Sequence, residues 1–330
     1  MKVLFTGIQP TGLLHIGNYF GAIRNWVELQ SRYRSFISIV DLHAMTILYE
    51  PARMPNQVFQ LALGLYACGI DMDETILFVQ SEVPGHADLT WIFNTLTPLG
   101  ELERMTQFKD KASRNRKNVN VGLLDYPVLQ AADILIYKGE VVPVGEDQVQ
   151  HVEFTREVAR YFNARYGETF PECQALLTET PRVVGLDGES KMSKSLDNFI
   201  GILETRDEIW AKLAPAKTDP ARVRRTDPGT PEICNIFSYH KLVTSEPELS
   251  GTIAEGCRTA GIGCIDCKRR LLANLMTVLD PIRERYHSLD ARKDDVRAVL
   301  DRNAEICRKA AAETIMEVKK RTGLTPVWKI

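Results

Sequence analysis

The N-terminal part of the chain alternates short apolar runs with longer amphipathic runs, and this alternation most constrains the fold. The pattern predicts strands over 2–6, 35–41, 75–80 and 140–144, and helices over about 17–31, 55–68, 86–96 and 146–163. Strands that alternate with helices form right-handed β–α–β units, which build a parallel sheet. We therefore expect an α/β fold with a doubly wound parallel sheet.

After about residue 200 the strand-like runs disappear and apolar residues recur at helical spacing. The polar, glycine-bearing stretch 185–198 separates the two patterns and is typical of an exposed loop. We predict a Rossmann-like domain over 1–189 and an all-helical C-terminal domain over 190–330.

Charge and composition exclude several classes of protein. Lys and Arg number 41 against 43 Asp and Glu, so the net charge is −2 and no global field points to nucleic acid. Thr6 and Gly7 break the first apolar run well short of a signal peptide, and no run approaches the ~20 apolar residues of a membrane helix. We therefore expect a cytoplasmic protein, and in such a protein seven cysteines argue against a disulfide framework.

The stretch "TGLLHIGNYFG", residues 11–21, lies where the first strand becomes the first helix. Open parallel sheets bind ligands at the carboxyl ends of their strands. Glycines there let the backbone approach a ligand, and the helix N-terminus favours an anion. His15 and Asn18 add side-chain donors, so the stretch is typical of a phosphate-binding turn. The alternative is a tight glycine turn whose histidine merely caps the helix.

The stretch "KMSKS", residues 191–195, places two lysines three positions apart between small and polar residues. A solvated loop is the plain alternative for such a pair. A mobile loop with two ammonium groups also suits a reaction in which negative charge builds on phosphates, because it can close over them in the transition state.

Together, "HIGN" after the first strand and "KMSKS" after the sheet domain resemble the two signature motifs of class I aminoacyl-tRNA synthetases. Asn18 stands where that family has the second histidine of H-I-G-H. The departure removes any role that needs a second imidazole, but it keeps a hydrogen-bonding group for phosphate.

Longer stretches narrow the resemblance to tryptophanyl-tRNA synthetases of the bacterial type, with tyrosyl-tRNA synthetase as the close sibling. They are "TGIQPTGLLHIGNYFGAI", "GELERMTQFKDK", "YPVLQAADILIY" and "VPVGEDQVQHVEFTREVARYFN". The resemblance implies a tryptophan–tRNA ligase that uses ATP with Mg²⁺, L-tryptophan and tRNA(Trp). It also implies a homodimer with its interface on the sheet domain.

Asp133 lies in the otherwise apolar stretch "LQAADILIY". A carboxylate there is costly unless it is paired or faces a ligand; the alternative is an aspartate on a helix surface. The resemblance implies that Asp133 accepts the indole N–H, which would reject phenylalanine because the buried acceptor would stay unpaired. The other tryptophan-binding residues we expect are Phe5, Gly7, His43, Gln107, Gln130, Val142, Val144 and Gln148.

The resemblance also implies a set of ATP-binding residues. They are Gln9, Pro10, Thr11, His15, Gly17, Asn18, Gly145, Glu146, Asp147, Val184, Lys191, Met192, Ser193, Lys194 and Ser195. Lys111, Lys191, Lys194 and Asn18 are expected to act in catalysis by stabilising charge on the phosphates. Asp147 could instead be an ordinary helix N-cap. Lys111 and Gln107 could instead lie on a solvated helix face.

Four cysteines follow the spacing C-x22-C-x6-C-x2-C: Cys234, Cys257, Cys264 and Cys267. Four thiolates suffice for a [4Fe–4S] cluster or a tetrahedral Zn²⁺; the alternative is four unrelated buried thiols. The spacing resembles that of a subset of tryptophanyl-tRNA synthetases with a [4Fe–4S] cluster, so we expect the cluster, with zinc as the second choice. The basic run 268–270 then suggests a nearby tRNA contact, although a solvated helix face is the simpler explanation.

Three other functions remain as alternatives. A small nucleotidyltransferase shares the H-I-G-H-type turn, but such chains are much shorter and lack the helical half. A synthetase-like RNA-binding protein that has lost catalysis is disfavoured by Lys191, Lys194 and Asp133. An iron–sulfur redox enzyme is disfavoured by the lack of a flavin or nicotinamide motif.

Overall fold

The computed structural model describes residues 1–109, 119–177 and 183–325, and at its centre lies a five-stranded parallel sheet. The strands are β1 (Val3–Ile8), β2 (Arg34–Ile39), β3 (Ile76–Val79), β4 (Val141–Val144) and β5 (Gln174–Leu177). Their order is β3-β2-β1-β4-β5 and each neighbouring pair is parallel, which confirms the predicted doubly wound sheet. Strand order reverses between β1 and β4, so this is the point where such sheets bind ligands.

Successive residues of the strands enter two different cores, one on each face of the sheet. On β2, Ile37 lies in one hydrophobic cluster and Phe36 in the other; on β3, Leu77 and Phe78 divide in the same way. Ile37 pairs with Leu77 in register, so the alternation is continuous across the strands. A strand that is apolar on both faces requires helices on both sides, as the sequence pattern predicted.

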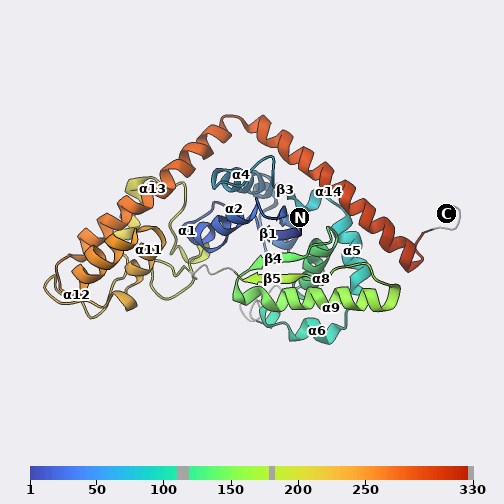
Figure 1. Cartoon of the computed structure of the whole chain (residues 1–330), viewed down its shortest axis with the longest axis horizontal. Coiled ribbons are helices and arrows are strands. Elements are labelled where there is room, and N and C mark those ends of the chain that lie inside the picture. The colour runs from blue at the N-terminus through green and yellow to red at the C-terminus, as the bar shows by residue number, and fades with distance from the viewer. Residues whose placement is uncertain (110–118, 178–182, 326–330) are drawn as a thin grey trace.

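Helices cover both faces of the sheet and build the C-terminal half (Figure 1). The α-helices are α1 (Ile16–Asn18), α2 (Arg24–Leu29), α3 (Asp41–Ala44), α4 (Met54–Ala67), α5 (Gly85–Asn94), α6 (Leu99–Arg104), α8 (Val121–Leu135), α9 (Val149–Tyr166), α10 (Arg206–Leu213), α11 (Asn235–Val243), α12 (Gly256–Arg258), α13 (Cys264–Asp290) and α14 (Lys293–Thr322). A π-helical stretch, Tyr19–Ile23, joins α1 to α2, so the first predicted helix is one helix with a π-helical middle.

Strand β5 was absent from the sequence-based prediction. It has only four residues, Gln174–Leu177, and its side chains are half-buried or exposed. Val142 to Val144 of β4 hold it in register through parallel pairing. A run so short and so little buried has no periodic signal of its own, and only the neighbouring strand makes it part of the sheet.

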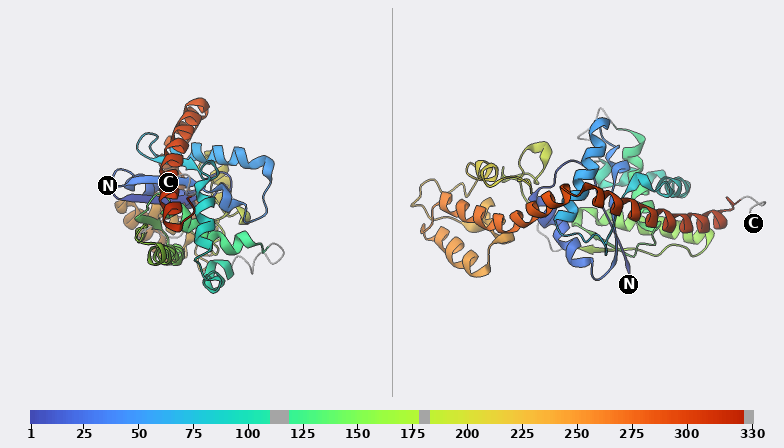
Figure 2. Two further views of the ribbon diagram at one scale, coloured as in Figure 1. Left: turned by 90° about the vertical axis from the view of Figure 1, so that its right-hand side faces the viewer. Right: turned by 90° about the horizontal axis from the view of Figure 1, so that it is seen from above.

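The helices α13 and α14 meet at a bend and form two long arms over the molecule (Figure 1). One arm, α13, packs with α10 and α11, whereas α14 returns across the sheet domain to β3 and α5. The view from above in Figure 2 shows α14 running past the sheet to the far end of the molecule. Cys307, Ala311 and Ile315 of α14 lie in the same core as Phe36 and Phe78.

Polar side chains of α14 bind backbone carbonyl groups along the β3 edge of the sheet. Asn303 donates from Nδ2 to the carbonyl of Leu77 at 3.0 Å, and Asn303 is itself buried. Arg302 donates to the carbonyl of Met72 at 2.7 Å and Arg308 to that of Glu82 at 3.1 Å. The helix therefore covers the edge strand by specific contacts.

In the described part of the chain, we find no helix that combines the length and apolar character needed to span a membrane.

Candidate active site

The carboxyl ends of β1 and β4 open to solvent at the point where strand order reverses. Gly7 is exposed although it lies in the central strand, and a Cβ there would come within 2.9 Å of Val40 Cγ1, so a larger residue would displace its neighbour. Gly145, Glu146 and Asp147, which follow β4, are exposed as well. This edge is therefore accessible to a ligand.

The first turn is bonded to the segment that follows the two-lysine loop. Ile16 N–H donates to the carbonyl of Ile200 at 2.9 Å, and Ile202 N–H donates to that of Leu14 at 3.0 Å. His15 forms an isolated antiparallel bridge with Gly201 between these bonds. Two motifs separated by more than half the chain are thus brought to one place.

Lys194 contacts the first turn directly. Its Nζ donates to the backbone carbonyl of Thr11 at 3.2 Å and lies 3.5 Å from the position a Cβ on Gly12 would take. Burial lowers the pKa of Lys194 to about 8. Met192 is buried, whereas Lys191 is exposed. The loop is thus anchored by its methionine and presents its lysines at the turn.

His15 is buried, with an exposed fraction of 8%, and its Nδ1 has no hydrogen-bond partner among the described residues. Burial, helped by the charges of Lys194 and Lys191, lowers the pKa of His15 to about 4. The imidazole is therefore neutral at pH 7. The side chain of Asn18 accepts a hydrogen bond from the His15 backbone N–H at 3.1 Å, which fixes the start of the helix.

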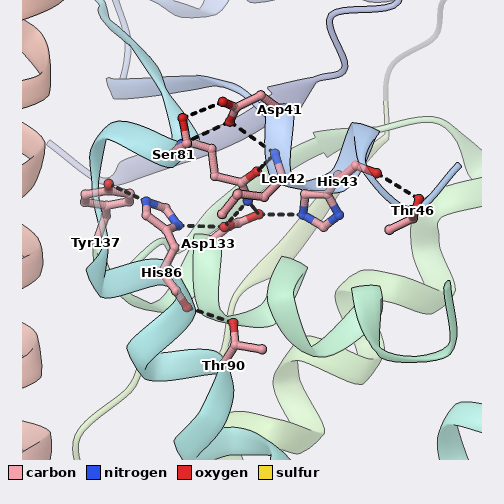
Figure 3. A network of polar contacts seen from close by, with 10 residues as sticks. Asp41, Leu42, His43, Thr46, Ser81, His86, Thr90, Asp133 and Tyr137 are labelled. Carbon is pink, nitrogen blue, oxygen red and sulfur yellow. Dashed lines mark hydrogen bonds and ion pairs between the residues drawn. The ribbon is translucent and has the colours of Figure 1, made fainter. Parts of the chain in front are cut away.

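A second polar cluster surrounds Asp133 on α8 (Figure 3). Asp133 is 1% exposed. Its Oδ2 lies 2.8 Å from Nε2 of His43, and its Oδ1 lies 2.6 Å from Nδ1 of His86. Gln80 donates from Nε2 to both oxygens, at 2.7 and 2.9 Å. Asp133 is therefore a buried, fully paired carboxylate and not an aspartate on a helix surface.

Opposing effects act on the ionisation of this carboxyl group. Burial raises its pKa, but hydrogen bonds from His43 and His86 outweigh burial and lower the pKa of Asp133 below its usual range. Tyr137, whose hydroxyl lies 2.8 Å from Nε2 of His86, has its pKa raised by burial. Asp133 is therefore ionised and Tyr137 protonated at pH 7.

An aromatic group packs beside the Asp133 cluster. Tyr137 stacks on Phe36 at 4.6 Å between ring centroids and on Phe5 at 5.9 Å. Val142 is buried in the same core, next to Phe5 on the neighbouring strand. These contacts place two of the residues predicted for the indole pocket, Phe5 and Val142, in the hydrophobic core beside Asp133.

The other predicted site residues divide by exposure. Half-buried are Gln9, Gly17, Asn18, Gln107, Gln130, Val144, Gln148, Val184 and Ser193. Pro10 is buried and Thr11 exposed. Lys111 lies outside the described residues, and of Ser195 only the backbone is described.

Gln80, His86 and Tyr137 were missed by the sequence analysis, although they complete the Asp133 cluster. A signal existed for two of them. Gln80 directly follows β3 and His86 begins α5, so both lie at the carboxyl end of a buried strand, beside the end of β2 that carries His43. Tyr137 lies in an apolar run and gives no such signal.

The four cysteines of the helical half lie within electrostatic reach of one another. The pKa of Cys267 is raised to about 12 by burial and then by Cys234, Cys257 and Cys264. Among the described residues, however, no group of three or more His, Cys, Asp or Glu is arranged to hold a metal ion. The structure therefore gathers the thiols without forming a ready coordination sphere.

Two buried cations lie beside these thiols. Arg222 is 8% exposed, donates from Nη1 to Cys257 Sγ at 3.6 Å, and its Nε has no partner in the described part of the chain. Lys268 is 4% exposed and donates to the carbonyls of Ala214 and Ala216, both at 2.7 Å. Buried cations favour an anionic neighbour, and metal-bound thiolates would provide one.

A family model described as "tRNA synthetases class I (W and Y)" matches residues 2–280. The chain belongs to this family of class I tRNA synthetases. Both of its signature motifs lie at the open edge described above, Asn18 included. The description covers the tryptophan and tyrosine members alike, so the relatives decide between them.

Among curated relatives of this class I synthetase, a tryptophan–tRNA ligase of Deinococcus radiodurans is 51% identical over 328 residues, covering 98% of this chain and 99% of its own. One from Thermotoga maritima is 44% identical over 328 residues, with 98% and 99% covered. The crystal structure of tryptophanyl-tRNA synthetase from Campylobacter jejuni complexed with ADP and tryptophan superposes with a TM-score of 0.88, at 35% identity, covering 98% of this chain and 100% of that one. Within the family, the chain therefore groups with the bacterial-type tryptophanyl-tRNA synthetases.

Proposed function

We propose that this protein is a tryptophan–tRNA ligase. It activates L-tryptophan with ATP to tryptophanyl-adenylate and pyrophosphate, and then transfers tryptophan to the 3′-terminal adenosine of tRNA(Trp). The observation that carries the proposal is the contact between Lys194 and Thr11, because it joins the two class I motifs at the switch point of the sheet. Relatives named tryptophan–tRNA ligase, 51% and 44% identical over nearly the whole chain, support tryptophan as the substrate.

In the first step, an oxygen of the tryptophan carboxylate attacks the α-phosphate of ATP, and pyrophosphate leaves with the electrons of the broken P–O bond. The protein contributes positioning and charge stabilisation. Lys194 and Lys191, with Lys111, would bind the departing pyrophosphate, and Asn18 would donate a hydrogen bond to the phosphates. Mg²⁺, bound with ATP, would neutralise part of the phosphate charge.

Asp133 would select the amino acid. Its carboxylate is ionised and buried, so an indole N–H that reaches it exchanges one charge-assisted hydrogen bond for another, whereas a phenyl ring cannot. Phe5, Gly7, Val142 and Val144 would line the indole pocket. The remaining predicted residues near the substrate amine and ring are His43, Gln107, Gln130 and Gln148.

ATP would bind along the open edge of the sheet. Gly145, Glu146 and Asp147 would contact the adenosine, with Val184 against the adenine. The neutral imidazole of His15 would donate to phosphate without repelling Lys194. In the second step the 2′-hydroxyl of the terminal ribose would attack the carbonyl of the adenylate, and AMP would leave.

For the helical half, 190–330, we propose tRNA anticodon binding, with a [4Fe–4S] cluster on Cys234, Cys257, Cys264 and Cys267 and Zn²⁺ as the second choice. The mutual proximity of the thiols and the buried charges of Arg222 and Lys268 support an anionic centre there. Such a centre would hold the surrounding segments together.

The protein would act as a homodimer through the sheet domain, 1–189. Trp91 on α5 is 73% exposed and borders a hollow of about 310 Å³ between α3, α5 and α8. Val121, at the start of α8 beside this hollow, is 79% exposed. Large apolar side chains that lie this open favour a protein partner.

Amino-acid-dependent ATP–pyrophosphate exchange tests the first step. We expect exchange with tryptophan and none with tyrosine or phenylalanine. Exchange with tyrosine alone would mean that the protein is a tyrosyl-tRNA synthetase. No exchange with any of the three, in a folded sample prepared without air, would exclude a ligase.

A further inference from the structure

In the structure, protein donors face all four acceptor positions of the Asp133 carboxylate, with the Gln80 amide shared between the two oxygens. A carboxylate offers about four acceptor positions, two on each oxygen. His86 and Gln80 donate to Oδ1, and His43 and Gln80 donate to Oδ2. An indole N–H can therefore reach Asp133 only if one of these donors leaves.

His86 is the least replaceable of the three donors. It is fully buried, and both ring nitrogens are bonded: Nδ1 to Asp133 at 2.6 Å and Nε2 to the Tyr137 hydroxyl at 2.8 Å. Its ring also lies 5.8 Å from that of Phe78, and its backbone carbonyl accepts from Thr90. Movement of His86 would break contacts on three sides of the ring.

Gln80 is held almost as firmly. It is fully buried and chelates Asp133 through one amide nitrogen, while its Oε1 accepts from the backbone N–H of Leu42 at 3.2 Å. Its departure would leave a buried donor and a buried acceptor unsatisfied, which is costly.

His43 is the donor with the weakest hold. It belongs to α3, a helix of four residues, and its ring makes one hydrogen bond to Asp133, from Nε2 to Oδ2. In the described part of the chain, its imidazole approaches the ring of Tyr126 edge-on, at 6.2 Å between centroids. His43 is buried, but its side chain is 8% exposed against 0% for His86, so it is the histidine of the pair nearer to solvent.

We propose that His43 holds the position of the indole N–H on Oδ2 of Asp133 and gives it up when tryptophan binds, whereas His86, backed by Tyr137, is the positioning residue that keeps Asp133 in place before and after binding. The exchange conserves the number of hydrogen bonds on the carboxylate. It rests on the proposed function in assuming that tryptophan is the ligand of this pocket.

Imidazole ¹⁵N spectra of the wild-type protein test the exchange without a mutation. The chain has six histidines, so single substitutions suffice to assign His43 and His86. On addition of tryptophan we expect the Nε2 signal of His43 to move as its carboxylate partner is lost, and the signals of His86 to stay. A shift at His86 with none at His43, or no shift at either although calorimetry shows bound tryptophan, would overturn the proposal.

Tryptophan affinities of paired variants give a second measurement. An Asn side chain at 43 is too short to replace Nε2, whereas Gln reaches it, so His43→Asn removes the donor and His43→Gln retains it. Because a competing internal partner raises the apparent Kd, His43→Asn should bind tryptophan about threefold more tightly than His43→Gln, which keeps the competing donor.

Substitution of His86 should change the affinity for tryptophan in the opposite direction. His86→Leu should weaken tryptophan binding roughly tenfold or more, because the buried carboxylate loses a fixed donor in both states. His86→Asn, whose amide can replace Nδ1, should restore most of the affinity for tryptophan. If His43→Asn weakens binding as much as His86→Leu does, His43 is not the exchanged partner. If wild type itself does not bind tryptophan, the proposed function fails and not the exchange.

Discussion

The two ends of the candidate site differ in how far their polar groups are satisfied before a substrate arrives. Around Asp133, each carboxylate oxygen has two donors and the surrounding side chains are buried. At the turn near Lys194, a half-buried ammonium has its pKa lowered by burial, and the buried His15 has a ring nitrogen without a described partner. One end is complete, and the other has unused capacity to bind an anion.

The difference follows from what each end must do. Discrimination between amino acids requires an acceptor whose position and charge do not change, and a saturated buried network provides this rigidity. Stabilisation of pyrophosphate requires positive charge that gains most when phosphate arrives, and a desolvated lysine provides it. Substitutions around Asp133 should therefore change the affinity for tryptophan and the stability of the fold. Substitutions around Lys194 should change the affinity for ATP and the rate of activation.

The largest effect should come from Asp133→Asn. An amide cannot accept from three donors as a carboxylate does, so tryptophan-dependent exchange should fall by roughly 10⁴-fold and the free energy of unfolding by about 3 kcal/mol. Pyrophosphate exchange and urea unfolding measure the two. The matched control is Asp125→Asn on the same helix, where Asn94 binds a half-buried carboxylate. Wild-type pyrophosphate exchange in Asp133→Asn would show that the Asp133 cluster does not select the amino acid.

Lys194→Met should lower kcat of the activation step by roughly 10²- to 10³-fold, since it removes charge that acts on the leaving pyrophosphate. The Kd of tryptophan and the urea midpoint should stay near wild type, because among the described residues Lys194 bonds the carbonyl of Thr11 alone. Lys194→Arg should recover part of the rate. A stability loss equal to that of Asp133→Asn would mean that both ends are structural in the same way.

A pH profile should sharpen the comparison. Lys194 is protonated below its pKa of about 8 and loses its charge as the pH rises through that value. The value of kcat/KM for ATP reports the free enzyme, so it should fall between about pH 8 and pH 9. In Lys194→Arg the guanidinium stays charged and this decline should disappear. The same decline in both proteins would assign it to another group.

The smallest effect should come from Gly17→Ala. A Cβ there would lie 2.9 Å from His15 Nδ1 and 3.3 Å from Met192 Cβ, so the two motifs must separate slightly. We expect KM for ATP to rise roughly fivefold with no change in KM for tryptophan. Gly21→Ala is the control, because among the described residues outside its own helix backbone a Cβ there comes within 4 Å of no atom. Equal effects from both substitutions would point to helix propensity instead.

The sequence predicted the parts of the fold that have a local period. Strands β1 to β4 and the helices between them follow from apolar alternation, and the meeting of "HIGN" with "KMSKS" follows from the family resemblance. Strand β5 was missed because its four residues are held by pairing with β4 and not by their own pattern.

The Asp133 cluster shows the same limit. Asp133 was recognisable because a carboxylate is costly in an apolar helix, and the resemblance gave His43. The partners Gln80 and His86 both follow β3 and lie 53 and 47 residues away from Asp133 in sequence. Only the strand order, with β3 beside β2, brings them next to His43, which follows β2. Topology of this kind is not encoded in any single window of the chain.

The contacts of α14 with the β3 edge carry a consequence for synthesis. A chain that emerges from the ribosome forms its N-terminal units first, so the sheet is complete while Asn303 and its neighbours are still unmade. Until then the β3 edge offers unpaired backbone groups, which template intermolecular strand pairing. The bond from Asn303 to Leu77 closes that edge. Premature stops before residue 293 should thus yield aggregates even though every strand of the sheet is present.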